Sequence, residues 1–228
     1  MAFLLSIETS TKVCSVALHE DGNLIAFTQY LLEKSHSSIL TSLIDEIIKH
    51  SGLKPNDIKA VAVSEGPGSY TGLRIGTSTA KGLCFGLDIP LINVSTLLSM
   101  AYAINDFNPN KAYLCPMLDA RRMEVYCLIA DSGLNIIRDV KPEIIDGNSF
   151  EDILKEHKVL FFGNGAAKCE NILRHWPNAQ FYYEIHPNAK DIGKLAWPRY
   201  QQEEFADLTY FEPFYLKAFW PGKPKTLV

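Results

Sequence analysis

The chain has 228 residues, 47% of them hydrophobic, which is enough to build the core of one large domain or of two smaller lobes. Its formal net charge of -4 argues against a protein whose whole surface grips nucleic acid, while a local basic patch stays compatible with it. The N-terminal residues lack a basic region and their apolar run is short, so neither a secretory signal nor a membrane span is expected. We therefore expect a cytoplasmic protein with no membrane partner.

The first half of the chain reads as three strands followed by alternating helices and strands. A turn signal at residues 20–23 separates the second strand from the third. Apolar residues then recur at helical spacing and Gly52 supplies a stop signal, which predicts an amphipathic helix. The expected elements are strands at residues 3–8, 13–19 and 24–30, a helix at 36–50, a strand at 58–64, a helix at about 70–85, a strand at 90–95 and a helix from residue 96.

The second half repeats this order of elements. Glu8 and Gly22 are separated by the same number of positions as Asp119 and Gly133, and strand, Gly-x-Gly and helix recur in both halves. A helix at residues 149–157 is expected where the first half has its first helix.

The repeat predicts two lobes, residues 1–105 and 106–228, each a mixed sheet with helices. The final segment is expected to be able to pack back on the N-terminal lobe. This is the α/β architecture of the two-lobed actin-like ATPases, an RNase H-like fold, and fold alone does not assign a function. A single open α/β sheet with a chance resemblance between the halves is the alternative.

The segment SEGPGSYTGLRIGTSTAKGLCFG, residues 64–86, raises the question of a phosphate-binding loop. A P-loop needs G-x-x-x-x-G-K-[ST], but Leu73 stands where its lysine should be. A dinucleotide fingerprint needs G-x-G-x-x-G, but Thr71 occupies the position of its last glycine. Both phosphate motifs fail, so no nucleotide or other cofactor is expected.

The same segment is instead expected to form a helix with glycines inside it. A glycine in a helix interior costs about 1 kcal/mol relative to alanine, so close packing must offset each one. At about 100° per residue, Gly72, Gly76 and Ala80 share one small face, and Arg74 lies on the opposite face. The small face either serves packing inside the chain alone or meets a partner, and the sequence leaves both open.

Several segments resemble the TsaB (YeaZ) family, in that family's order along nearly the whole chain. They are LLSIETSTKVCSVAL, HSSILTSLIDEII, SEGPGSYTGLRIGTSTAKGL, IPLINVSTL, LDARRMEVY and GNGA, of which GPGSYTGLRIG is highly specific. The resemblance implies a non-catalytic scaffold subunit of the bacterial machinery that forms threonylcarbamoyladenosine at position 37 of tRNAs reading ANN codons. It also implies two partners, the catalytic paralogue TsaD and, through the complex, the ATPase TsaE.

The surface that docks the TsaD homologue, or a second copy of this chain when TsaD is absent, is expected on the helices at residues 36–50 and 70–85. The first has a broad apolar stripe and the second has small residues that permit close helix contact. Contact with tRNA is expected to be indirect or weak. The predicted interface residues are Ile39, Leu43, Tyr70, Gly72, Arg74, Gly76 and Ala80.

No metal site is expected. TsaD-type proteins bind a metal through H-x-x-x-H on a helix, a spacing that sets both imidazoles on one face. The six histidines here are never three or four positions apart, and the five cysteines form no C-x-x-C pair, which fits buried reduced thiols. These residues are His19, His36, His50, His157, His175, His186, Cys14, Cys84, Cys115, Cys127 and Cys169.

Charged residues follow the first strand of each half. Glu8 and Asp119 occupy positions where actin-like ATPases keep acidic groups for metal-bound water, but without a phosphate-gripping hairpin we favour polar turn formers. Arg121 and Arg122 either hold a phosphate or carboxylate or form a turn-stabilising ion pair.

The tail mixes Lys217, Lys223 and Lys225 with Phe219 and Trp220, a mixture typical of contacts with single-stranded RNA. The prolines and glycine between them favour an ordinary frayed end.

The alternative function is an independent actin-like nucleotide-binding phosphotransferase, which would require tight nucleotide binding by the isolated chain. A peptidase is the third interpretation, and neither a Ser/His/Asp or Cys/His constellation nor a metal spacing supports it.

Overall fold

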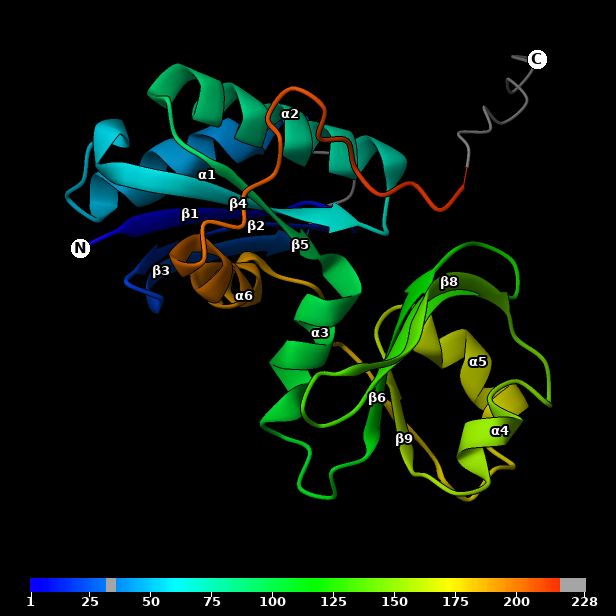
Figure 1. Ribbon diagram of the computed structural model, residues 1–228. Coiled ribbons are helices and arrows are strands. Elements are labelled where there is room, and N and C mark those ends of the chain that lie inside the picture. The colour runs from blue at the N-terminus through cyan, green and yellow to red at the C-terminus, as the bar shows by residue number, and fades with distance from the viewer. Residues whose placement is uncertain (32–35, 218–228) are drawn as a thin grey trace, which may run out of the picture.

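Two five-stranded mixed sheets, each covered by helices, form the two lobes of the molecule (Figure 1). The computed structural model describes residues 1–31 and 36–217. The first sheet contains β1 (Phe3–Glu8), β2 (Val13–Glu20), β3 (Asn23–Leu31), β4 (Ile58–Gly66) and β5 (Leu91–Ser95). The second contains β6 (Tyr113–Asp119), β7 (Glu124–Ala130), β8 (Ile136–Ile144), β9 (Val159–Phe162) and β10 (Ala179–Tyr182).

The first sheet has the order β3-β2-β1-β4-β5. β2 pairs antiparallel with β1 and β3, whereas β4 pairs parallel with β1 and β5. Helices α1 (His36–His50) and α2 (Tyr70–Leu87) cover one face, and α6 (Ala189–Gln201) covers the other (Figure 1). Because both faces are covered, the inner strands are near-continuous apolar runs such as FLLSIE and IKAVAVS.

The second sheet has the matching order β10-β9-β6-β7-β8, with β6 and β7 antiparallel and β9 parallel to β6. The expected two-lobed α/β fold is therefore confirmed. The expected helix at residues 149–157 is wrong in length, because α4 covers only Glu151–Leu154. Phe150 before it has a φ of 63°, a left-handed conformation that cannot continue a right-handed helix. On the same face, α5 (Ala166–Leu173) completes the cover of this sheet.

The last helix of each half packs on the sheet of the other half. α3 (Thr96–Asn105) follows β5 of the first sheet, yet Leu97, Met100 and Ile104 join the core of the second sheet. α6 follows β10 of the second sheet, yet Ile192 and Ala196 join the core of the first. α3 and α6 also contact each other, so they tie the two lobes together. The division of the chain at residue 105 stays a prediction.

The chain after α6 returns along the first lobe toward the second (Figure 1). Ala206 forms an isolated β-bridge with Leu91 at the outer strand β5. Further on, the backbone N–H of Phe214 donates to the carbonyl oxygen of Glu65 at 2.7 Å. We call residues 205–217 the C-terminal strap.

Candidate functional site

The start of α2 lies against the turn that follows β1. Ser69, the residue before α2, donates its backbone N–H to the carbonyl oxygen of Ser10 at 2.6 Å. Its side-chain oxygen accepts a hydrogen bond from the N–H of Gly72 at 3.3 Å, which caps the helix. Thr9 Oγ1 donates to the carbonyl oxygen of Gly72 at 2.8 Å. Two backbone N–H groups at this helix N-terminus, those of Ser69 and Gly72, are thus engaged within the chain and are not turned to a phosphate.

Gly72 and Gly76 are required by this close approach. A Cβ on Gly72 would lie 2.1 Å from the carbonyl oxygen of Thr9, and one on Gly76 would lie 2.3 Å from Thr9 Oγ1. Both distances are far inside the range of ordinary van der Waals contact. The small face of α2 therefore serves packing within the chain.

Four of the predicted interface residues are buried in the isolated chain, and their assignment to an interface stays a prediction. Leu43 of α1 and Gly72, Gly76 and Ala80 of α2 are buried on the sides of their helices that face the first sheet. Ile39 and Tyr70 are half-buried and Arg74 is exposed, and their assignment to a docking surface also stays a prediction.

The outer face of α2, defined here by Arg74, Ser78, Gly82, Phe85 and Gly86, is exposed. Phe85 is 82% exposed, an unusual position for a large apolar side chain. A Cβ on Gly82 or Gly86 would meet no atom within 4 Å, so packing inside the chain does not account for either glycine. Beside this face lies a groove of about 430 Å³ between α1 and α2, lined by Ser37, Tyr70, Thr71, Arg74, Ile75, Ser78 and Thr79.

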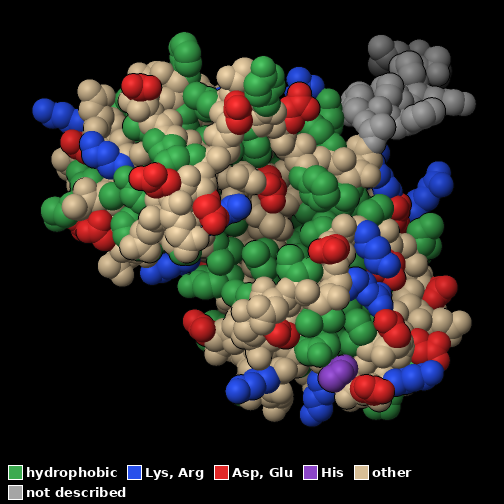
Figure 2. All heavy atoms as spheres, in the orientation of Figure 1, with side chains coloured by type: hydrophobic (Ala, Val, Ile, Leu, Met, Phe, Trp, Pro, Cys, Tyr) green, Lys and Arg blue, Asp and Glu red, His purple; other side chains and the backbone are tan. Residues whose placement is uncertain are grey.

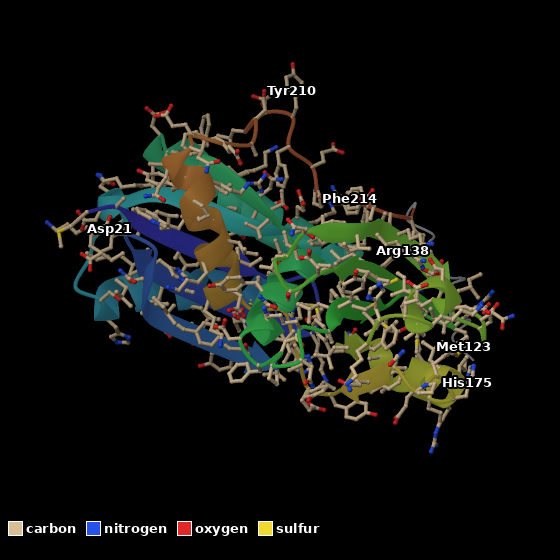
Figure 3. All side chains as sticks on the ribbon, turned by 60° about the horizontal axis from the view of Figure 1, so that its bottom comes forward. Asp21, Met123, Arg138, His175, Tyr210 and Phe214 are labelled. Atoms are coloured by element: carbon tan, nitrogen blue, oxygen red, sulfur yellow. The ribbon has the colours of Figure 1, made fainter. Side chains whose placement is uncertain are left out.

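The C-terminal strap borders the same groove, a feature that the sequence analysis missed. The rings of Tyr70 and Tyr215 lie with their centroids 4.8 Å apart, and Arg74 Nη1 donates to the hydroxyl oxygen of Tyr70 at 2.8 Å. Figure 3 shows Tyr210 of the strap pointing away from the molecule and Phe214 lying further along toward the second lobe. No local pattern predicts these contacts, because more than a hundred residues separate Tyr70 from Tyr215.

Glu8 at the end of β1 is sealed inside the first lobe. Its side chain is fully buried, and Oε1 accepts a hydrogen bond from the backbone N–H of Ser10 at 2.5 Å. Burial raises the pKa of this carboxyl above its ordinary value, and the hydrogen bonds from Ser10 only partly oppose the shift. A carboxyl enclosed in this way shapes the turn and offers no open face to a metal-bound water.

Asp119, the counterpart of Glu8, is exposed, and its carboxylate contacts residues of its own lobe. Its carboxylate forms an ion pair with Lys168 of α5, and its Oδ1 also accepts from the backbone N–H of Arg121 at 2.9 Å. Lys168 Nζ donates further to the carbonyl oxygens of Arg122 and Glu124, each at 2.7 Å. The ion pair that fixes this turn therefore comes from Lys168, which no spacing rule pointed to, while the side chains of Arg121 and Arg122 are exposed.

The histidines and cysteines form no metal centre among residues 1–31 and 36–217, where no group of three His, Cys, Asp or Glu side chains is suitably placed. All five cysteines are buried and free, which confirms the expectation of structural thiols. Burial raises the pKa of Cys14, Cys84 and Cys169 to about 11, so these sulfurs stay protonated near neutral pH.

The tail that resembles an RNA contact lies mostly outside the described residues. Of its five singled-out residues only Lys217 is described, and it forms an ion pair with Glu124 of the second lobe. Figure 2 shows Lys and Arg side chains interspersed with Asp and Glu over one whole face of the molecule. Within the described part of the chain, no helix is long and apolar enough to span a bilayer.

Comparison with known sequences relates the chain to one family. The sequence model described as "TsaD: tRNA N6-adenosine threonylcarbamoyltransferase" matches residues 30–219. The tRNA threonylcarbamoyladenosine biosynthesis protein TsaB of Haemophilus influenzae is 41% identical over 123 residues, which cover 54% of this chain and 51% of that protein. This match spans only about half of the length of that relative. TsaB of Bacillus subtilis is 27% identical over 94% of this chain and 93% of that protein.

A solved structure supports the fold. The structure described as YeaZ from Pseudomonas aeruginosa superimposes with a TM-score of 0.80 over 95% of this chain and 100% of that chain. The two sequences are 24% identical, so this likeness concerns the architecture alone. The chain thus belongs to the family described by the TsaD sequence model and, within it, to the TsaB (YeaZ) group.

Proposed function

We propose that this chain is a non-catalytic scaffold subunit that supports formation of threonylcarbamoyladenosine at position 37 of tRNAs reading ANN codons. The names of the H. influenzae and B. subtilis relatives supply the pathway. The observation that carries the scaffold role is the outer face of α2. There the 82% exposed Phe85 lies between Gly82 and Gly86, two glycines that packing inside the chain does not explain.

The catalytic partner in this proposal is a TsaD homologue. The match of the TsaD sequence model to residues 30–219 relates this chain to that partner and supports the pairing. A TsaE homologue joins through the complex, and two copies of the chain meet when TsaD is absent. The tRNA is contacted weakly or only through the partner, in keeping with the mixed charges of the surface in Figure 2.

The contacts that the candidate catalytic groups make within the chain support a non-catalytic role. Glu8 is buried, and the start of α2 is occupied by the turn of Thr9 and Ser10. Asp119 is neutralised by Lys168. A phosphotransferase would need these positions open for a nucleotide and its metal ion.

The docking surface in this proposal is the outer face of α2 with the groove beside it. Phe85 supplies a large apolar anchor, and Gly82 and Gly86 let a partner helix approach closely. Arg74 supplies a cation at the edge of the groove, where Tyr70 and Tyr215 hold its position.

Light scattering of this chain mixed with the TsaD homologue of its organism tests the proposal. We expect a complex with the summed mass of both chains. Phe85→Glu should weaken the complex by about tenfold or more, because it places a charge on the apolar anchor.

Phe107→Glu is the matched control, since Phe107 is 73% exposed and follows α3, away from the outer face of α2. It should bind as the wild type does. Absence of a complex with the wild-type chain would overturn the scaffold role. Equal binding by both variants would overturn the docking surface alone.

The alternative, an independent nucleotide-binding phosphotransferase, is tested by calorimetry with ATP and magnesium. We expect no saturable heat from the isolated chain. Tight binding would favour the alternative.

A further inference from the structure

The C-terminal strap is fixed to the first lobe by contacts spread along its length. Three of its apolar side chains, those of Ala206, Leu208 and Phe211, pack against the core of the first lobe. Lys81 of α2 donates its Nζ to the carbonyl oxygens of Thr209 at 3.2 Å and Phe211 at 3.1 Å. The strap therefore follows one path over the first lobe.

The end of β4 is shaped to let the strap pass. The backbone N–H of Phe214 donates to the carbonyl oxygen of Glu65, and the next residue of β4, Gly66, has a φ of 116°, a region that favours glycine. A Cβ on Gly66 would lie 2.9 Å from the carbonyl oxygen of Phe214. The strap and β4 thus meet backbone to backbone, at a distance that a side chain at position 66 would prevent.

The end of the strap reaches the second lobe. The ring of Tyr215 still lies against Tyr70 of α2, with the centroids 4.8 Å apart. Two residues further on, Lys217 forms an ion pair with Glu124 of β7, and its Nζ lies 5.9 Å from the centroid of the Tyr126 ring. The last described residues of the strap therefore contact both lobes.

This crossing lies on a different side of the molecule from the helices that join the lobes. α3 and α6 contact each other, and each packs on the sheet of the other lobe. Figure 1 shows the strap, orange to red, running along α2 at the top of the view, whereas α3 joins the lobes lower in the view. Two rigid lobes joined along one side can turn about that joint. A contact on another side restricts the turn.

We propose that the C-terminal strap is a clasp that holds the second lobe in one position relative to the first, with the ion pair between Lys217 and Glu124 as its releasable contact. A partly exposed ion pair is weak by itself. Here the anchored strap keeps Lys217 beside the second lobe, so the effective concentration of the two charges is high. Because the contact at its end is weak, the clasp opens without unfolding of either lobe.

Pulsed electron paramagnetic resonance of the isolated chain tests the clasp, independently of any partner. Spin labels are attached at Lys49→Cys on α1 and at Lys155→Cys after α4, since these lysine side chains are 70% and 60% exposed. All five native cysteines are buried, so the label reacts with the two introduced ones. With the strap intact we expect one narrow distribution of distances between the labels.

Lys217→Glu should broaden this distribution and raise the fraction of long distances by about threefold or more, because it places two like charges at the contact. Lys217→Gln removes the cation without adding repulsion and should cause a smaller change in the same direction. Salt at about 1 M should shift the intact chain toward the Lys217→Gln distribution. Asp152→Asn is the control, because it removes an ion pair with Arg138 inside the second lobe and should leave the distances unchanged.

A charge swap tests whether the ion pair itself closes the clasp. Glu124→Lys alone should broaden the distribution, and its combination with Lys217→Glu should restore the narrow one. Circular dichroism spectra equal to that of the wild type establish that the variants fold. The proposal is wrong if Lys217→Glu and Lys217→Gln leave the distances unchanged, if Asp152→Asn changes them as much, or if the double variant stays as broad as either single variant.

Discussion

Thr9 is the residue against which the glycines of α2 are fitted. Its carbonyl oxygen and its hydroxyl both sit where a side chain at position 72 or 76 would begin. The sequence identified the small face of the helix by its period, but it left open what that face meets. The answer lies some sixty residues away along the chain, in a turn whose hydroxyl residues gave no sign of the contact.

Two alanine substitutions separate the glycines that packing requires from those it does not. Gly72→Ala should lower the free energy of unfolding by roughly 1 to 3 kcal/mol, because its Cβ would overlap the carbonyl oxygen of Thr9 at 2.1 Å. Gly82→Ala should raise it by about 0.5 to 1 kcal/mol through helix propensity alone. Urea denaturation measures both values. An equal effect of the two substitutions would show that Thr9 is not the reason for Gly72.

His19 makes the stability of the first lobe depend on pH. The side chain is fully buried beneath α6, and Nε2 lies 3.0 Å from the carbonyl oxygen of Lys190. Burial lowers its pKa from 6.5 to about 4. Between those two pH values the unfolded chain binds a proton that the folded chain excludes, so the free energy of unfolding falls as the pH is lowered.

The loss attributable to His19 should be on the order of 3 kcal/mol between pH 6.5 and pH 4. Urea denaturation of the wild type and His19→Gln at several pH values isolates it. The comparison is needed because the raised pKa of Glu8 acts in the opposite sense over part of the same range. Parallel pH profiles for the two proteins would contradict this assignment.

At the scale of elements, periodicity predicted most of what the structure contains. α1 has the predicted bounds, and α2 begins at the predicted Tyr70 and ends two residues beyond the predicted Phe85. The helix expected at residues 149–157 begins only at Glu151, because Phe150 adopts a left-handed conformation that no pattern of apolar residues reveals, and it ends already at Leu154. The C-terminal strap has no periodic pattern of apolar residues, so its position could not be predicted from the sequence. Contacts with α2 and β4 determine that position.

Lys81 of α2 binds the strap through two hydrogen bonds, in which its Nζ donates to the carbonyl oxygens of Thr209 at 3.2 Å and Phe211 at 3.1 Å. Lys81→Ala should release this part of the strap. We expect the amide hydrogen of Phe214, which bonds Glu65, to exchange about tenfold faster.

Hydrogen exchange read by mass spectrometry measures this opening. Lys59→Ala is the control, because Lys59 makes only a long bond of 3.4 Å to the carbonyl oxygen of Asn56. Unchanged exchange of the strap in Lys81→Ala would mean that Tyr215 and Lys217 suffice to hold it.

At the scale of the whole molecule, the repeat predicted two lobes with one topology, and the strand orders confirm this. It did not reveal that α3 and α6 each pack on the other lobe's sheet. A period in the sequence fixes which elements form, whereas the choice between two apolar sheets depends on the geometry of the connections. Likewise, the apolar stripe of one helix and the small residues of the other pointed to α1 and α2. Only burial separated the outer residues of these helices from those that the chain keeps inside.

The claim that this chain works as an accessory subunit through the outer face of α2 rests on the whole assembly. The most direct measurement is mass spectrometry of threonylcarbamoyladenosine in tRNA, after a reconstituted reaction with the TsaD and TsaE homologues of the same organism. We predict that no modification forms without this chain. At a limiting concentration of the chain, Phe85→Glu should lower the yield of modified tRNA by about tenfold or more. A Glu8→Gln variant that folds should give the same yield as the wild type. Full modification without this chain, or its loss with a folded Glu8→Gln variant that still binds TsaD, would contradict the account.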